Sequence, residues 1–475
     1  MDKNDLFERI DSLEDRLLDV AQELWDHPEL GLQEENSAEL LASFLEEEGF
    51  NVETDIGGMP TAFVASCGDG GPTIGILGEY DALPGLSQTV SATREPVDEG
   101  GPGHGCGHNL FGVAGVGAAI GIKDAIDAGD LEGTIVFYGC PAEETLVGKT
   151  YMARAGVFDE LDAALTWHPG RLSTPTMSSF NALNSLTFTY EGTSAHAAAS
   201  PDSGRSALDG VELLNLGVEF MREHVSDDAR IHYSITDGGG APNVVPGTAT
   251  VWYFVRAPSR AEVERNTAWL RDIADAAATM TQTDVSERFL TGCYDYQPNE
   301  IVTNVIWDNM KSIDPIEYDE SDREFASELQ ETIPDEDIDA SLSDLPDELF
   351  ERVRASALYV EPVPAYDQDE TIHGSTDVGD VSWITPTGQF RAATWPIGTP
   401  SHSWQIVAAN GDFSQKGISF AAKVLAGSAF DLLDDSRLLE AVRTEFEATI
   451  GTDQYESPLP DDAKPPFDIT SMGGN

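Results

Sequence analysis

Short apolar segments separated by helical patterns constrain the fold of the first third of this chain most strongly. Three of them are almost continuously apolar: 73–78 (TIGILG), 133–140 (GTIVFYGC) and 161–168 (LDAALTWH). Strands of this kind are buried on both faces, as in a parallel sheet covered by helices. Helices are predicted near 3–26, 36–49 and 108–128. The sequence therefore predicts an α/β fold with a largely parallel mixed sheet flanked by helices.

The pattern changes after residue 182, where apolar and polar residues begin to alternate. Leu186, Phe188 and Tyr190 alternate with hydroxyl side chains, as expected for a strand with one buried face. The elements predicted next are a helix, two strands, a helix and a strand, near 204–225, 230–236, 248–257, 260–280 and 284–293. This order is that of a ferredoxin-like sheet. We expect an inserted ferredoxin-like α+β domain over 183–297, within a larger domain formed by 1–182 and 298–475.

Residues 313–365 form an acidic stretch that contains several prolines. A helix is predicted there near 345–357, and the rest shows no clear periodicity. We interpret this stretch as a solvated insertion on the surface of the larger domain.

The charge of the chain excludes some functions. It has 85 acidic and 26 basic residues, a formal net charge of −59 at pH 7. Nucleic-acid binding needs clustered cations, so a nucleic-acid partner is not expected. The acidic residues are spread along the whole chain, and its apolar periodicity argues against disorder. We interpret the charge as an adaptation to molar salt, where the Debye length falls to about 3 Å.

The amino-terminal residues carry no signal for secretion. They are acidic and amphipathic, without a basic start followed by an apolar stretch. The longest run of small apolar residues, 111–122, is glycine-rich and too short to span a bilayer. We therefore expect a cytoplasmic protein without a membrane partner. Its four cysteines show no paired spacing, and structural disulfides are not expected in that compartment.

Residues 104–109 (HGCGHN) place the Cys106 thiol two residues before the His108 imidazole, at the start of a predicted helix. Flanking glycines let the backbone turn tightly and leave room for a ligand. A thiolate and an imidazole, joined by a carboxylate, suit zinc or a similar divalent ion. Taken alone, the same stretch would equally be a glycine loop with a buried thiol.

Further polar residues follow the apolar strands. Glu143 and Glu144 follow the strand at 133–140, and His168 ends the next one. Open α/β sheets bind ligands at the carboxyl ends of their strands, so one carboxylate can bind a metal while the other acts as a base. His196 and His402 lie in glycine-containing loops and would mean little in isolation.

Five separated motifs together resemble a known family. They are HGCGHN (104–109), PAEE (141–144), WHP (167–169), GTSAHAA (192–198) and GTPSHSWQ (398–405). In this order they are similar to the dinuclear metallopeptidase-type amidohydrolases, which include N-acyl amino acid and plant auxin-conjugate hydrolases. GEYDALPGLSQ (78–88) and HGSTDVGDVSW (373–383) resemble most the branch that hydrolyses aminobenzoyl-glutamate. The resemblance covers about residues 5 to 450.

The resemblance implies a role for each matching residue. The implied metal ligands are Cys106, His108, Glu144, His168 and His402. Glu143 would be the general base, and His196 would reach across a dimer to polarise the scissile carbonyl. Asn243 and Arg256 match positions that contact substrate, Arg256 through a carboxylate. Branches with an aspartate as bridging ligand have a His-x-Asp motif, but Asp81 lacks that histidine, so Cys106 would bridge and Asp81 would have a supporting role.

The implied function is metal-dependent hydrolysis of the amide bond of small N-acyl or N-aroyl amino acids. Two divalent ions per subunit are expected, as zinc, manganese or cobalt, and 1–182 with 298–475 would be the metal-binding catalytic domain. The inserted domain would serve as a lid and would form a homodimer, because an exposed sheet edge can pair with a second copy. A companion subunit is also possible within this branch.

Two other functions are compatible with parts of the sequence. One is a cysteine hydrolase with Cys106 as nucleophile and a nearby histidine as base. Such an enzyme would not need Glu144, His168 and His402, and it would resist chelation. The other is a catalytically silent homologue that binds a ligand or a partner, although such a homologue would be expected to have lost the base or a ligand.

Overall fold

The chain forms two compact units in a computed structural model that describes residues 2–368 and 370–472. The first unit contains Met1–Ser178, Gln297–Glu370 and Val381–Tyr455. The second contains Ser179–Tyr296, Thr371–Asp380 and Glu456–Asn475. Parts of the expected domain ranges, residues 1, 369 and 473–475, lie outside the described residues. Each unit has its own sheet and its own apolar core.

The first unit is built on a seven-stranded mixed sheet in the order β1-β2-β4-β3-β5-β13-β6. The strands are β1 (Asn51–Thr54), β2 (Phe63–Gly68), β3 (Thr73–Glu79), β4 (Thr134–Cys140), β5 (Ala163–Gly170), β6 (Thr174–Pro175) and β13 (Thr387–Ala393). Strands β3, β4, β5 and β13 run parallel, whereas the pairs β1–β2, β2–β4 and β13–β6 are antiparallel. The three apolar segments are β3, β4 and β5, so the predicted largely parallel mixed sheet is confirmed.

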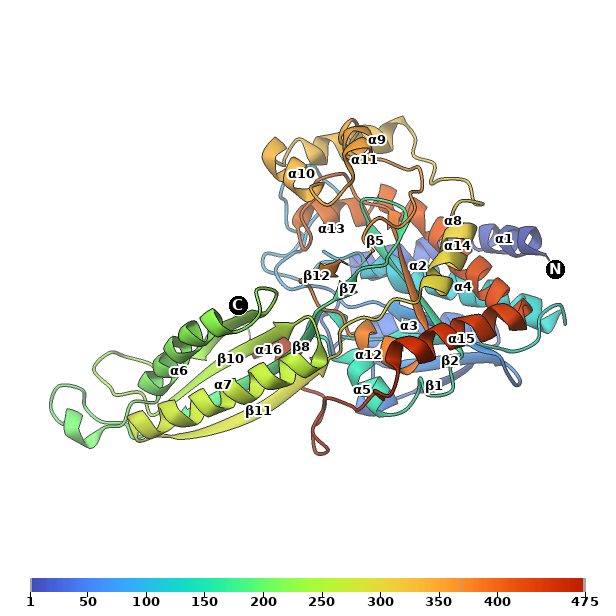
Figure 1. Cartoon of the computed structure of the whole chain (residues 1–475). Coiled ribbons are helices and arrows are strands. Elements are labelled where there is room, and N and C mark those ends of the chain that lie inside the picture. The colour runs from blue at the N-terminus through green and yellow to red at the C-terminus, as the bar shows by residue number, and fades with distance from the viewer. Residues whose placement is uncertain (1, 369, 473–475) are drawn as a thin grey trace. The chain divides into compact units, whose positions relative to one another are not determined.

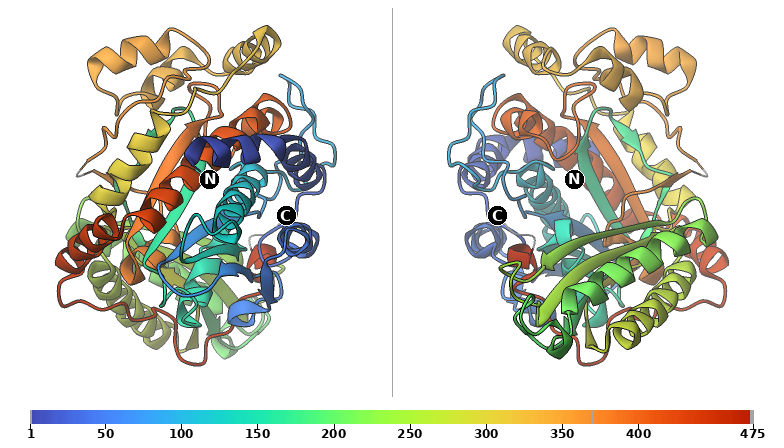
Figure 2. Two further views of the ribbon diagram at one scale, coloured as in Figure 1. Left: turned by 90° about the vertical axis from the view of Figure 1, so that its right-hand side faces the viewer. Right: turned by 90° about the vertical axis from the view of Figure 1, so that its left-hand side faces the viewer.

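Helices flank this sheet, as predicted (Figures 1 and 2). They are α1 (Lys3–Ser12), α2 (Glu14–Asp26), α3 (Glu35–Glu47), α4 (His108–Asp127), α5 (Gly148–Arg154), α8 (Glu300–Met310), α13 (Trp404–Asn410), α14 (Gly417–Asp434) and α15 (Ser436–Ile450), with 3₁₀ turns η1 (Ile56–Gly58), η2 (Glu143–Thr145) and η5 (Phe413–Lys416). The single helix predicted over 3–26 is two helices, because the Leu13 amide donates to the Ile10 carbonyl and tightens the turn between them.

Helix α4 lies in the centre of the first unit and packs against both α14 and the sheet. It is 20 residues long and, among the described residues, is the one helix whose length and composition would allow it to cross a membrane. Most of it is buried inside the unit, however, as expected for a core helix. Its glycines permit this packing, since a Cβ at Gly112 would lie 2.8 Å from the Glu79 carbonyl oxygen.

The acidic stretch 313–365 is more ordered than its sequence suggests. It contains α9 (Glu320–Gln330), α10 (Asp335–Ser341) and α11 (Asp347–Arg354). Its buried Ile338 and Leu342 pack in one cluster with Leu172 and Ile397 of the same unit. The stretch is therefore a helical subdomain with an apolar core, and the interpretation as a solvated insertion is wrong.

The second unit has the predicted ferredoxin-like arrangement. Its four-stranded antiparallel sheet has the order β11-β8-β10-β9. The elements are β8 (Ala182–Glu191), η3 (Pro201–Ser203), α6 (Ala207–Met221), η4 (Arg222–His224), β9 (Arg230–Asp237), β10 (Thr248–Ala257), α7 (Arg260–Thr281) and β11 (Asp284–Cys293). Helices α6 and α7 cover one face of the sheet (Figure 1). Three short elements, β7 (Ser179–Phe180), β12 (Thr371–Ile372) and α16 (Ile469–Met472), complete the unit, and the chain passes between units within α12 (Val378–Ile384).

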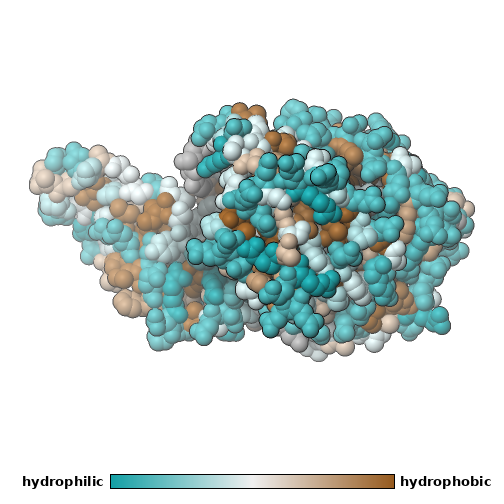
Figure 3. Space-filling model, turned by 90° about the horizontal axis from the view of Figure 1, so that it is seen from above, coloured by the Kyte–Doolittle hydropathy of each residue, from teal (hydrophilic) through white to brown (hydrophobic). Residues whose placement is uncertain are grey.

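The alternation of strand β10 explains how this sheet divides its residues. Val251, Tyr253 and Val255 are buried against the helices, whereas the residues between them are half-buried on the opposite face. That opposite face carries Phe254 and Arg256. On the molecular surface seen in Figure 3, hydrophilic residues dominate and apolar residues form small patches.

Candidate metal centre

The predicted site residues of the first unit lie after the carboxyl ends of its parallel strands. Strand β3 ends at Glu79 and is followed by Asp81, and β4 ends two residues before the turn that holds Glu143 and Glu144. His168 lies on β5, which continues to Gly170 rather than ending at this histidine. Open α/β sheets place ligand sites at this edge.

Cys106 belongs to two groups of metal-binding side chains. The first group is Cys106, His108 and His168, and the second is Cys106, Glu144 and His402. Within each group the candidate ligand atoms lie within 4.8 Å of one another. Sγ of Cys106 lies 3.3 Å from Nε2 of His168, and Nε2 of His402 lies 3.3 Å from a carboxylate oxygen of Glu144. All five predicted ligands are therefore brought together, with the thiol shared by both groups.

Hydrogen bonds orient two of the imidazoles. Nδ1 of His168 lies 2.7 Å from the Pro169 carbonyl oxygen, so this nitrogen carries the proton and Nε2 faces Cys106 with its lone pair. Nδ1 of His108 lies 2.8 Å from the Asp81 carboxylate. A carboxylate behind a histidine in this way is the usual second partner of a metal-binding imidazole.

The donor set fits divalent cations. Nε2 of His108 and Oε1 of Glu144 are completely buried and have no hydrogen-bond partner among the described residues. Buried polar atoms nearly always have a partner, so these two atoms indicate a ligand at this point. Burial and neighbouring His108 lower the pKa of His168 to about 3, which keeps its imidazole neutral and able to bind a metal. Thiol, imidazole and carboxylate together suit zinc and related ions.

Asp81 links the two groups of ligands. It is buried, and while one of its carboxylate oxygens faces His108, the other accepts a hydrogen bond of 2.9 Å from the Glu144 amide. Asp81 thereby positions a ligand of each group. The geometry agrees with a supporting role for this residue.

The turn after β4 is held in an unusual backbone conformation. Ala142 and Leu146, on either side of the 3₁₀ turn η2, have φ values of 54° and 58°. Non-glycine residues rarely adopt this region and do so mostly where the surroundings enforce it. Here the Glu34 carboxylate accepts a hydrogen bond of 2.8 Å from the Ala142 amide. This turn presents Glu143 and Glu144 in succession.

Backbone constraint also extends to two other site residues. Gly107, which precedes α4, has a φ of 78°, and a Cβ there would lie 2.8 Å from Pro169. The position therefore requires glycine, as the short spacing of the CGH motif suggested. His402 has a φ of 58° and is about half exposed, at the end of a glycine-containing loop.

A buried ion pair beside the centre was not predicted. Nζ of Lys149 lies 2.7 Å from the Glu79 carboxylate, and both side chains are almost completely buried. The other oxygen of Glu79 lies 3.3 Å from Nε2 of His108, and Glu79, His108 and Glu143 form a third group of candidate ligands. The GEYD stretch pointed to this region, but a single lysine at the start of a short helix carried no signal.

Three predicted residues, His196, Asn243 and Arg256, belong to the second unit. The loops of His196 and Asn243 meet, because the Ala197 amide donates to the Asn243 carbonyl at 3.0 Å. Both loops follow the end of the sheet where Glu191 pairs with Thr248. Arg256 lies eight residues further along β10, about 26 Å away at 3.3 Å per residue. His196 and Arg256 therefore lie at opposite ends of one sheet.

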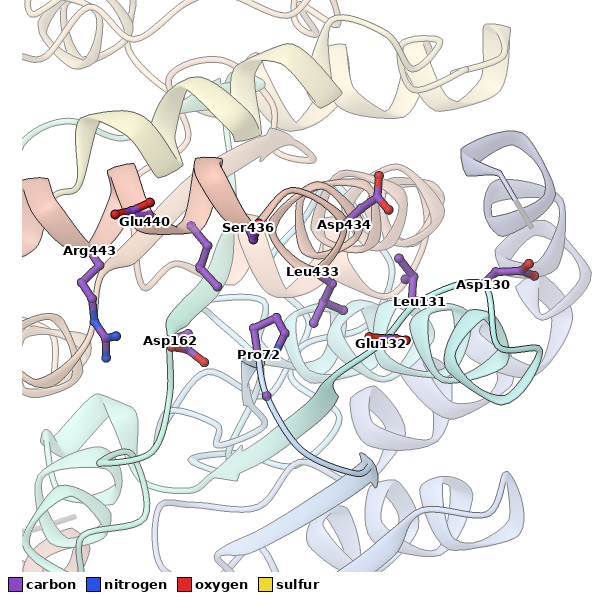
Figure 4. A pocket seen from close by; sticks show the side chains of 12 residues that line it. Pro72, Asp130, Leu131, Glu132, Asp162, Leu433, Asp434, Ser436, Glu440 and Arg443 are labelled. Atoms are coloured by element: carbon purple, nitrogen blue, oxygen red, sulfur yellow. The ribbon is translucent and has the colours of Figure 1, made fainter.

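The pocket in Figure 4 is separate from the metal centre. It has a volume of about 530 Å³ and lies where strands β3, β4 and β5 begin, whereas the predicted ligands lie where they end. Its lining includes Pro72, Glu132, Asp162 and Arg443. Its position gives no reason to connect it with the chemistry of the centre.

Comparison with known proteins agrees with this geometry. Residues 181–280 match the peptidase dimerisation domain. One of the two named subunits of Escherichia coli p-aminobenzoyl-glutamate hydrolase is 41% identical over 464 residues, which cover 95% of this chain and 96% of that protein. The chain belongs to the M20 peptidase family. A mouse relative in this family, Xaa-Arg dipeptidase, is 30% identical over 94% of this chain and 92% of that protein.

The fold of the M20 family is also found among solved structures. A Bacillus subtilis protein described as a dinuclear metal-binding peptidase of the M20 family superposes with a TM-score of 0.53 at 18% identity. The match covers 87% of this chain and 99% of that protein. As a member of the M20 family, the chain is a hydrolase of amide bonds, and the predicted family and enzyme class are confirmed.

Proposed function

We propose that this chain is a metal-dependent amidohydrolase that releases the amino acid from small N-acyl or N-aroyl amino acids. The observation that carries the proposal is that Cys106 belongs to two groups of candidate ligands. The name of the Escherichia coli relative makes p-aminobenzoyl-glutamate the first substrate to test. The catalytic domain is assigned to 1–182 and 298–475, and the lid to 183–297.

In this proposal Cys106, His108 and His168 hold one cation, and Cys106, Glu144 and His402 hold a second. Two divalent ions, as zinc, manganese or cobalt, would act as Lewis acids on the amide carbonyl and on the attacking water. Cys106 is the shared ligand. Asp81 orients His108 and the Glu144 turn, a role in which mutation typically weakens metal binding.

The remaining steps belong to residues of the chain. Glu143 accepts a proton from the water as its oxygen attacks the acyl carbon, and returns that proton to the leaving nitrogen as the C–N bond breaks. His196 donates a hydrogen bond to the carbonyl oxygen, where negative charge develops. Asn243 contacts the substrate, and the Arg256 guanidinium binds its carboxylate.

We further propose a homodimer formed through the lid. His196 and Arg256 lie at opposite ends of one sheet, so one site can contain both only if they come from different copies. Strand β9 is an edge strand, and helix α6 exposes Leu216 and Phe220, 51% and 68% accessible. Exposed edges and apolar patches of this kind are typical of interfaces. The Escherichia coli hydrolase is named as an enzyme of two different subunits, which makes a companion subunit a second partner to test.

The cellular setting of the enzyme is also a proposal. We assign it to the cytoplasm of a cell with high internal salt, because its net charge of −59 would otherwise repel strongly within the fold. Screening by molar salt reduces that repulsion.

The decisive activity test uses wild type and Glu143→Ala, assayed with p-aminobenzoyl-glutamate and other N-acyl amino acids. We expect chelation to abolish wild-type turnover and the variant to be inactive. Turnover that survives chelation but is lost in Cys106→Ala would instead support the thiol mechanism. Intact metal binding without turnover of any acyl amino acid would favour a silent, ligand-binding homologue.

A further inference from the structure

Two arginines lie directly opposite each other in the sheet of the second unit. Arg256 on β10 pairs with Arg230 on β9, on the face that helices α6 and α7 leave uncovered. Directly opposed residues have β-carbons about 4.5–5.5 Å apart, and like charges in such positions destabilise a sheet. His232 is the next residue of β9 on this face, and burial together with the nearby guanidinium groups lowers its pKa.

Neither arginine has an acidic partner. Among the described residues, neither guanidinium forms an ion pair, although the chain has 85 acidic residues against 26 basic ones. Arg230 donates to the carbonyl groups of Asp227 and Ala229, and Arg256 donates through Nε to the Ser375 hydroxyl at 3.2 Å. The terminal nitrogens of Arg256 have no hydrogen-bond partner within the described part of the chain.

Neighbouring side chains hold the two guanidinium groups in place. The Arg256 guanidinium stacks over the Phe254 ring at 4.9 Å, and the Arg230 guanidinium lies 3.2 Å from Nε2 of His373. His373 and Ser375 come from the HGSTDVGD segment, which belongs to the same unit. Stacking and hydrogen bonding of this kind fix an arginine before a ligand arrives, which favours bidentate recognition of carboxylates.

We propose that Arg256 and Arg230 together bind the two carboxylates of a dicarboxylic amino-acid moiety, glutamate or aspartate, in the substrate. The separation of opposed residues matches the short carbon chain between those carboxylates. Two anionic groups would also relieve the repulsion between the arginines. This inference rests on the proposed function, in which Arg256 already binds one carboxylate, and it narrows the substrate class to N-acylated acidic amino acids.

The test compares p-aminobenzoyl-glutamate with p-aminobenzoyl-glutamine, which differ in one carboxylate and have nearly the same shape. We expect wild type to have the higher kcat/KM for the glutamate compound. Arg230→Gln should lower the glutamate-to-glutamine ratio of kcat/KM about tenfold or more, as expected for the loss of a charge-assisted hydrogen bond. Arg222→Gln is the matched control, because Arg222 lies nearby but is paired with Glu219 at 3.0 Å, and its ratio should stay at the wild-type value.

An unchanged ratio in Arg230→Gln would overturn the inference, even if inorganic phosphate binds at Arg230. If wild type hydrolyses neither compound, the proposed function fails, and binding of N-benzoylglutamate and N-benzoylglutamine then decides. Tighter binding of the glutamate compound that is lost in Arg230→Gln supports the paired site. Equal binding of both compounds to wild type contradicts it.

Discussion

The Asp81 carboxylate lies 2.8 Å from Nδ1 of His108, and both side chains are completely inaccessible to solvent. The Asp81 carboxylate and the rest of this environment raise the pKa of His108 against the opposing effect of burial. A cation at Nε2 would take the place of the proton there, so the pair prepares the imidazole to bind metal.

Replacing this carboxylate should weaken metal binding more than it weakens the fold. In Asp81→Asn the amide keeps the shape but removes the charge behind His108 and one acceptor for the Glu144 amide. We expect metal affinity to fall about 10- to 100-fold, as for other partners of metal-binding histidines. Titration calorimetry with zinc or manganese measures this. The exposed Asp69→Asn is the control, and an Asp81→Asn affinity equal to that of the control would contradict the assigned role.

The opposite locations of His196 and Arg256 predict complementation between inactive variants. His196→Ala and Arg256→Ala should each be inactive alone. After the two are mixed, dissociated and reassociated, about a quarter of wild-type activity should return, because half of random dimers are hybrids and each hybrid has one intact site. No recovery, with exchange verified by mass spectrometry, would mean that His196 does not act in the partner's site.

The buried Glu34 predicts a dependence of stability on pH. Burial, with a contribution from Asp81, raises the pKa of Glu34 from 4.5 to about 8 in the folded protein. The folded state therefore binds this proton more tightly than the unfolded state, and stability falls as the pH rises from about 4.5 to 8. Glu34→Gln keeps the acceptor for the Ala142 amide but cannot ionise.

We therefore expect Glu34→Gln to raise the free energy of unfolding by about 1–3 kcal/mol at pH 9 and by much less at pH 5. The measurement is urea unfolding of chelated protein, because bound cations would themselves lower the pKa of nearby carboxyls. The exposed Glu39→Gln serves as control. A gain of equal size at both pH values would show that the ionisation of Glu34 is not the cause.

The net charge of −59 predicts a requirement for salt. Lowering the ionic strength from about 1 M to 0.01 M lengthens the Debye length from about 3 to 30 Å, so acidic groups across the surface repel one another. We expect the thermal midpoint to fall steeply with dilution of NaCl and the fold to be lost at low salt. A midpoint that is independent of salt would contradict the proposed adaptation.

Much of the centre could be predicted because its residues follow strands that the sequence reveals. Continuous apolar runs identify β3, β4 and β5, and polar residues directly after parallel strands must meet at one edge. The ion pair of Lys149 with Glu79 could not be predicted. Its partners are 70 positions apart in sequence, and nothing local distinguishes a buried lysine from an exposed one.

The helical subdomain could not be predicted for a similar reason. Ile338 and Leu342 stand among acidic residues, and what buries them is contact with Leu172 and Ile397, which are distant in sequence. Helix α10, at seven residues, is also too short to be stable alone. Tertiary contacts therefore determine this part of the fold.

The central claim is that Cys106 is shared by two cations, and metal analysis of purified protein tests it most directly. We predict two divalent ions per chain in wild type and in Glu143→Ala, which should lack turnover, and the loss of both ions in Cys106→Ala with the fold retained by circular dichroism. Two ions retained in Cys106→Ala, or at most one ion in fully loaded wild type, would contradict the shared site.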